Sequence, residues 1–125
     1  MLDDKDAFAN LAVSDLGRAR RFYEGTLGLN AVHEEGGELV VYKTGHTTIN
    51  VYRSRFAGTN RATAVTWVVG SDLDRIVRAL KERKVAFEHY DMPGLRLDGD
   101  VHVGKDMKVA WFRDPDGNIL SLVTG

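Results

Sequence analysis

The 125-residue sequence predicts an α+β fold of two βαβββ modules, which form a curved, mostly antiparallel eight-stranded sheet with the two helices on its outer face. Two repeats indicate the duplication. The tripeptide Ser-Asp-Leu occurs at residues 14–16 and again at residues 71–73, and the triplet at residues 49–51 corresponds to the one at residues 120–122. The two copies of the second repeat are further apart in the sequence than the two copies of the first. The second module therefore contains extra residues, which we assign to residues 91–106.

The first module is predicted to span about residues 7–54, in the order strand, helix and three strands. Residues 7–13 are apolar and compatible with a strand, and a Ser-Asp pair of helix-capping types follows. Apolar residues at helical spacing predict a helix over residues 16–27, which Gly28 can terminate. Glycine-containing turns separate three strands, which cover residues 30–35, 38–44 and 47–53.

The second module is predicted over about residues 62–124. A strand at residues 63–69 precedes a helix with a capping box, in which Ser71 is the cap and an acid follows three residues later. The helix is expected to end near Lys84, where glycine would be the easier residue because a left-handed conformation is needed. Further strands are expected at residues 85–90, 108–113 and 118–124, with a long loop at residues 91–106.

The last two strands are joined by Asp-Pro-Asp-Gly-Asn at residues 114–118. Proline presets φ for a turn, glycine accepts positive φ, and the Asx side chains can accept hydrogen bonds from backbone N–H groups. This segment therefore predicts a hairpin, whose second strand carries Ser121.

The composition limits the classes of function. Charged residues make up 28% of the chain and the formal net charge is -1, which does not favour a nucleic-acid partner. Cysteine is absent, which excludes disulfides, thiolate nucleophiles and cysteine-based metal sites. The first residues carry acids rather than an apolar signal, and no segment is apolar enough to span a membrane. We therefore expect no membrane partner and a cytoplasmic location.

Three features occur together and in a fixed order: the repeated βαβββ unit, Val-Ser-Asp-Leu at residues 13–16 followed by Phe-Tyr at 22–23 and Leu-Gly-Leu at 27–29, and Trp-Phe-Arg-Asp-Pro-Asp-Gly-Asn at 111–118. In these features nearly the whole chain resembles the vicinal oxygen chelate superfamily, which includes glyoxalase I, fosfomycin-resistance enzymes, extradiol dioxygenases and bleomycin-resistance proteins. The resemblance implies a small-molecule ligand in a cleft shared by the modules, a divalent metal bound by His, Gln or Glu side chains, and a homodimer.

Four positions correspond to the metal ligands of that superfamily. The position five residues before Val13 holds Phe8, and its counterpart in the second module is Val65. The carboxylate position after the Asp-Pro-Asp-Gly turn holds Ser121, and its counterpart is Asn50. A divalent ion needs several charged or lone-pair donors, which phenyl and isopropyl groups do not supply, so we expect neither a metal nor another cofactor.

Strand parity predicts which side chains line the cleft, because residues two apart share a face of a strand. If Phe8 and Val65 point inward, several polar and aromatic neighbours point the same way, a mixture typical of a small-molecule pocket. Alternatively, the apolar members of this set fill the cleft as core. The predicted lining is Phe8, Asn10, Thr48, Asn50, Tyr52, Val65, Trp67 and Ser121.

The four histidines, His33, His46, His89 and His102, do not have metal-binding spacing and are interpreted as surface or strand residues. His46 in a turn and His102 in the long loop could instead serve as a general base. Glu88 precedes the long loop and could present a carboxylate at the rim of the cleft. The sequence does not select among them, so no catalytic residue is assigned.

Three functions remain open at this point. The first is metal-independent binding of a small molecule, of the glyoxalase/bleomycin-resistance type, which the lost ligand positions favour. The second is a lyase, isomerase or transferase that acts on a small oxygenated substrate with a non-standard metal or with no metal. The third is an interaction module with a vestigial cleft, in which sheet edges or residues 91–106 contact another protein.

Overall fold

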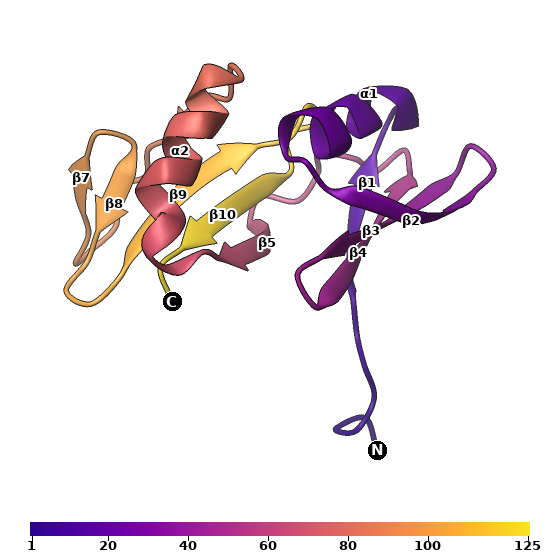
Figure 1. Ribbon diagram of the computed structural model, residues 1–125, viewed down its shortest axis with the longest axis horizontal. Coiled ribbons are helices and arrows are strands. Elements are labelled where there is room, and N and C mark those ends of the chain that lie inside the picture. Colours follow the sequence, from indigo (N-terminus) through magenta and orange to yellow (C-terminus); the bar gives the residue numbers. More distant parts are fainter. The chain divides into compact units, whose positions relative to one another are not determined.

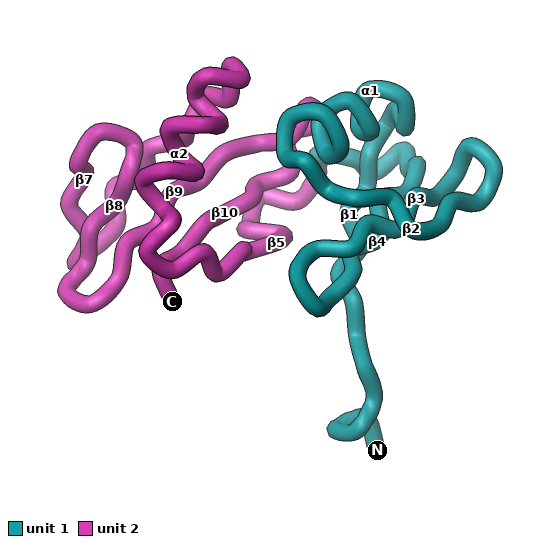
Figure 2. Tube along the Cα trace, in the orientation of Figure 1, with its two compact units in different colours: residues 1–58 teal, residues 59–125 magenta.

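The computed structural model describes all 125 residues, which divide into two compact units (Figure 2). Unit 1 comprises Met1–Gly58 and unit 2 comprises Thr59–Gly125, so the boundary falls in the segment between the two expected modules. None of the helices has the length and apolar character needed to cross a membrane.

Unit 1 has the expected order of one strand, a helical segment and three strands (Figure 1). Its strands form a four-stranded sheet in the order β1-β4-β3-β2, in which β1 and β4 are parallel and the other neighbours are antiparallel. The elements are β1 (Ala9–Val13), α1 (Leu16–Arg20), the π-helix η1 (Arg21–Thr26), β2 (Asn30–Glu35), β3 (Leu39–Thr44) and β4 (Thr47–Arg53).

The helical segment of unit 1 begins and ends where the sequence predicts. Asp15 caps its start, since its carboxylate accepts a hydrogen bond from the Arg18 N–H over 3.0 Å. Gly28 follows its end with a φ of 76°, a conformation that glycine adopts without steric cost. The expected single α-helix instead changes to π geometry at Arg21, while Tyr23 remains fully buried.

The sheet of unit 1 has one buried face and one open face. Asn10 and Tyr52 lie at alternate positions on the open face and are exposed. The residues between them point into the core of the unit. The buried positions on β1, β3 and β4 are Leu11, Val13, Val40, Tyr42, Ile49 and Val51.

Unit 2 has a six-stranded sheet and one α-helix (Figure 1). The strand order is β5-β10-β9-β8-β7, with β6 also paired to β9, and only β5 and β10 are parallel. The elements are β5 (Thr63–Val68), the 3-10 turn η2 (Gly70–Asp72), α2 (Leu73–Glu82), β6 (Phe87–Glu88), β7 (Arg96–Asp98), β8 (Val101–Val103), β9 (Lys108–Arg113) and β10 (Ile119–Val123).

The strands therefore form two mixed sheets rather than the single eight-stranded sheet that was expected. The two additional strands, β7 and β8, lie in the segment expected to be a loop, and they form a hairpin that turns at Gly99 with a φ of 62°. This hairpin extends the sheet because β8 pairs with β9 beyond the short β6.

The ends of α2 give one wrong and one confirmed prediction. The capping box is wrong, because Ser71 lies inside the 3-10 turn and Asp72 occupies the cap position without a side-chain hydrogen bond. The end is confirmed: Lys84 has a φ of 70° and is the one non-glycine residue with positive φ. The apolar side of α2 contributes Leu73, Val77 and Leu80 to the core of unit 2.

Candidate functional site

The open face of unit 1 carries the lining residues predicted for the first module. Asn10 and Asn50 are partners in the parallel β1–β4 pair, and Nδ2 of Asn50 donates a hydrogen bond to Oδ1 of Asn10 over 3.2 Å. Thr48 and Tyr52 alternate with Asn50 along β4 and share its face, with Tyr52 39% exposed. Phe8, directly before β1, is 57% exposed, so within unit 1 it is not a core residue.

Ser121 lies on the open face of unit 2 and is itself buried by its neighbours. Its register partners are Thr66 on β5 and Trp111 on β9. The hydroxyl oxygens of Ser121 and Thr66 are 2.7 Å apart and share a hydrogen bond. Trp111 is half-buried, and its Nε1 donates to Oγ1 of Thr63 over 3.1 Å. Two threonines, a serine and an indole therefore lie together on this face.

Val65 and Trp67 lie on the opposite face from Ser121, contrary to the parity prediction. Their register partners on β10 are two buried leucines, at positions 120 and 122. Side chains of paired positions share a face, so both residues point to the buried side of the sheet. The expectation that they line the same surface as Ser121 is corrected accordingly.

The connection between strand and helix explains the change of face. Asn10 lies six positions before the start of α1, whereas its equivalent Thr66 lies seven positions before the start of α2, so one extra residue separates β5 from its helix. A β-bulge at Ala64, where the register of the β5–β10 pair shifts, comes before Val65 and affects only the start of β5. The repeated tripeptide therefore aligns the helix starts but not the strands before them.

Three rings form a cluster beside Ser121. The centroid of His102 is 4.9 Å from that of Trp111, and the centroid of Tyr90 is 5.2 Å from it, both with edge-to-face geometry. The Tyr90 N–H donates to Nε2 of His102 over 2.9 Å. An imidazole nitrogen that accepts a hydrogen bond carries no proton, so His102 is neutral with its proton on Nδ1. Sequence reasoning had placed His102 in a loop, whereas it is buried on β8.

Two ion-paired groups flank this cluster. Glu88 forms an ion pair with Arg113 and thereby raises the pKa of the guanidinium. Asp100 accepts from Lys81 over 2.5 Å and pairs with Nε2 of His89 over 2.8 Å, and these two contacts lower the pKa of its carboxyl group. Glu88 is therefore an ion-pair partner in this structure rather than a free acid.

The remaining two histidines belong to unit 1. His46 is exposed in the turn between β3 and β4, as the sequence predicts. His33 is exposed on β2, with its Nε2 3.5 Å from the Glu35 carboxylate.

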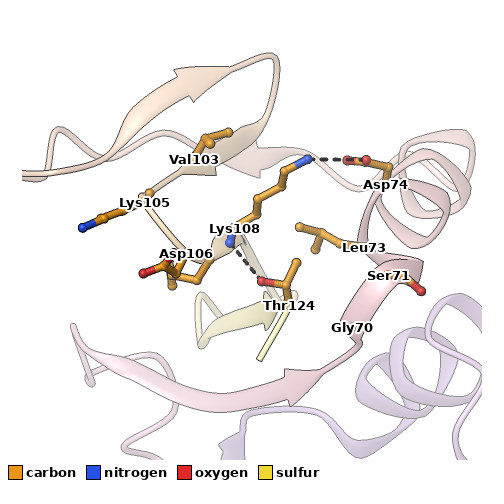
Figure 3. Close-up of a pocket in the computed structure, with 11 residues that line it drawn as sticks. Gly70, Ser71, Leu73, Asp74, Val103, Lys105, Asp106, Lys108 and Thr124 are labelled. Atoms are coloured by element: carbon orange, nitrogen blue, oxygen red, sulfur yellow. Dashed lines mark hydrogen bonds and ion pairs between the residues drawn. The ribbon is translucent and has the colours of Figure 1, made fainter.

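A pocket of about 560 Å³ lies elsewhere in unit 2, between the start of α2 and the β8–β9 turn (Figure 3). Lys108 pairs there with Asp74 at 3.9 Å, and its backbone N–H donates to Oγ1 of Thr124 over 3.0 Å. Lys105 and Asp106 add one further charge of each sign, so the lining has no excess charge. None of the predicted lining residues belongs to this pocket.

The residues at the ligand positions do not fit a divalent metal. In unit 1 they are a phenyl ring and an amide, at Phe8 and Asn50, and in unit 2 they are the isopropyl group of Val65, on the other face, and the hydroxyl of Ser121. No group of three or more His, Cys, Asp or Glu side chains is arranged to hold a metal ion. Neutral amide and hydroxyl oxygens do not supply the charged or imidazole donors that such sites use.

The chain is built from two βαβββ units, the second of which carries the additional β7–β8 hairpin. The model of the glyoxalase/bleomycin resistance protein/dioxygenase superfamily matches residues 7–122. The chain belongs to this superfamily. No curated protein sequence matches the chain.

Several solved structures share the fold. A glyoxalase family protein from Enterococcus faecalis has 19% identity and a TM-score of 0.73, over 98% of this chain and 99% of that one. The fosfomycin resistance protein FosX from Mesorhizobium loti has 16% identity and a TM-score of 0.70, over 98% and 92%. An integron cassette protein from the Halifax Harbour sewage outfall metagenome has 16% identity and a TM-score of 0.72, over 97% and 99%.

Proposed function

We propose that this protein binds a small molecule without a metal ion, in the manner of the bleomycin-resistance members of its superfamily. One observation carries the proposal: each open sheet face presents a neutral hydrogen-bonded pair beside an aromatic ring. In unit 1 the pair is Asn10 and Asn50 and the ring is Tyr52. In unit 2 the pair is Thr66 and Ser121, with Trp111 as the ring.

These surfaces suit an aromatic or amphipathic ligand with a few polar atoms. Aromatic side chains offer large apolar contact area, and amide and hydroxyl groups fix orientation without carrying charge. The pairs already satisfy part of their own hydrogen bonding, so they keep their positions when a ligand removes water from the face. The two neutral pairs themselves offer a divalent ion no carboxylate or imidazole to balance its charge.

Tryptophan fluorescence can test this proposal cleanly. Both tryptophans lie in unit 2, with Trp111 on the open face and Trp67 on the buried one. A Trp67→Phe variant therefore leaves one reporter on the proposed surface. Titration of this variant with a library of aromatic compounds should identify ligands that change its emission, and Trp111→Phe with Trp67 retained is the matched control.

Metal dependence is tested on the same samples. We expect ligand binding and the melting temperature to be unchanged by EDTA and by added Ni²⁺, Zn²⁺, Mn²⁺ or Fe²⁺. Binding that EDTA abolishes and one of these ions restores would contradict the metal-independent proposal. The absence of any ligand for the Trp111 reporter would contradict the binding proposal itself.

An enzymatic function is the second candidate, and similarity to the structures of fosfomycin resistance proteins favours it. It would be a lyase, isomerase or transferase acting on a small oxygenated substrate. Glyoxalase, thiol-transfer and dioxygenase assays, with and without the same metal ions, would detect turnover. The expected homodimer stays a prediction, which sedimentation equilibrium tests.

A further inference from the structure

The ring cluster of unit 2 contains two buried polar atoms that have no hydrogen-bond partner. These atoms are Nδ1 of His102 and Oη of Tyr90. His102 is 1% exposed, so bulk water does not solvate its ring. A buried polar group without a partner carries the full penalty of desolvation, and such groups are rare in folded proteins.

Both orphan groups are hydrogen-bond donors. Nε2 of His102 accepts from the Tyr90 N–H, which leaves the proton of the neutral ring on Nδ1. The phenol of Tyr90 keeps its proton and can donate it as well. The missing partner is therefore an acceptor atom, and neither group can be satisfied by a ligand that offers only N–H or C–H.

The surrounding charges indicate that this acceptor is neutral. The nearest charged groups are paired with one another, Glu88 with Arg113 and Asp100 with Lys81 and His89. Arg113 also lies against the Tyr90 side chain, and Glu88 balances its charge. A carboxylate buried there would add an unbalanced negative charge, whereas a carbonyl oxygen needs only hydrogen-bond donors.

We propose that Tyr90 and His102 bind a neutral carbonyl oxygen of an aromatic ligand, such as an aryl ketone, whose ring packs against Trp111. This inference rests on the proposed function and assigns the polar end of the ligand to unit 2. The Trp111 side chain controls access to this subsite, because its half-buried ring contacts both donor residues. Its indole N–H donates one hydrogen bond, to Thr63. Rotation of this side chain uncovers the two donors.

Three probes of similar ring size test the inference in the Trp67→Phe background. Acetophenone carries a neutral carbonyl, ethylbenzene lacks the acceptor, and benzoate carries a charge. We expect acetophenone to change Trp111 emission with at least ten-fold higher affinity than either of the others. In ¹H–¹⁵N spectra of the histidine rings, acetophenone should also shift the Nδ1–H signal of His102, and ethylbenzene should not.

Two variants remove one donor each. Tyr90→Phe deletes only the hydroxyl, and it should weaken acetophenone binding at least five-fold while leaving the melting temperature equal or higher. His102→Gln keeps an acceptor for the Tyr90 N–H but removes Nδ1–H, and it should weaken binding similarly. Tyr42→Phe is the matched control in unit 1, where the hydroxyl is also buried but bound to Glu24, and it should not change acetophenone affinity.

Equal affinities for acetophenone and ethylbenzene, or an unchanged affinity in Tyr90→Phe, would overturn the inference. The same holds if benzoate binds best, if Tyr42→Phe weakens binding as much as Tyr90→Phe, or if none of the probes affects Trp111. The inference would also be overturned if, at saturating acetophenone, an ordered water remained hydrogen-bonded to both donors. The proposed function fails separately, when the compound library yields no ligand for the Trp111 reporter.

Discussion

The hydrogen bond between Tyr42 and Glu24 ties the helical segment of unit 1 to its sheet, and Tyr42→Phe removes it alone. Tyr42 on β3 is fully buried, and its Oη donates to Oε2 of Glu24 on η1 over 2.8 Å. The same oxygen accepts from Nε of Arg20 over 2.6 Å, and Arg20 also pairs with Glu34 on β2. The substitution keeps the buried ring and takes away one donor of this network.

The expected cost at neutral pH is about 1–2 kcal/mol of unfolding free energy. A hydrogen bond to a charged group contributes about 1.5–3 kcal/mol. Glu24 is 33% exposed and retains its contact with Arg20, so water and the guanidinium replace part of the lost bond. The expected cost is therefore centred on the lower limit of that range.

The pH dependence follows from two opposite pKa shifts. Arg20, and to a smaller extent Tyr42, lower the pKa of Glu24 below its ordinary 4.5, while burial opposes them, so this contribution is lost as the pH falls through the folded pKa. Burial and Glu24 raise the pKa of Tyr42 above its ordinary 10.0, so its contribution is lost as the pH rises above 10. The difference between wild type and Tyr42→Phe should be constant from about pH 5 to 9 and shrink on both sides.

Urea denaturation followed by far-UV circular dichroism measures this difference. The backbone signal is needed because unit 1 contains no tryptophan. Wild type and Tyr42→Phe are compared at pH 3.5, 7 and 10.5. A difference below about 0.5 kcal/mol at pH 7, or one that is equal at all three pH values, would refute the assigned role of this bond, since a bond to a charged group contributes more.

Three further substitutions test other parts of the fold. Lys84→Gly should raise stability by about 1 kcal/mol because it relieves the left-handed lysine, and an unchanged or lower melting temperature would contradict this. Ser121→Ala should cost about 0.5–1.5 kcal/mol by tryptophan-detected urea denaturation, since only one neutral hydrogen bond is lost; a cost above about 3 kcal/mol would indicate a further role. Asp100→Asn should speed hydrogen exchange in the β7–β8 hairpin at pH 7. Because Lys81 and His89 lower the pKa of Asp100, this difference should decrease as the pH falls below 3.8 and vanish once the pH is below the lowered pKa; a difference that does not decrease over this range would count against the ion pairs.

Local signals in the sequence predicted most elements of the two units. The strands at residues 30–35, 47–53 and 108–113 lie at the expected residues, because alternating apolar residues and glycine turns act over short distances. The conformation of Lys84 was likewise predictable, since a helix that stops without glycine must place another residue in the left-handed region.

The β7–β8 hairpin was not predictable in the same way. Its strands have three residues each, too short for a periodic pattern, and they depend on pairing with β9 and on contacts of Asp100 with distant residues. The burial of His102 follows from that pairing. A histidine between two valines in a glycine-rich segment gives no local sign that a tryptophan and a tyrosine cover it.

The face of Val65 and Trp67 was not predictable either, because one extra residue between β5 and α2 moves every residue of the strand to the opposite face relative to the helix start. In the observed register the two units show a common feature. Asn10 pairs with Asn50 across β1 and β4, and Thr66 pairs with Ser121 across β5 and β10, so each parallel strand pair carries one neutral pair on its open face. Charged metal-ligand side chains at these positions would have a high desolvation cost unless a metal ion compensated their charge. The desolvation cost of the neutral pairs is small. A βαβββ fold can therefore change from binding an ion to binding an uncharged molecule when its charged side chains are replaced by neutral side chains that hydrogen-bond to each other.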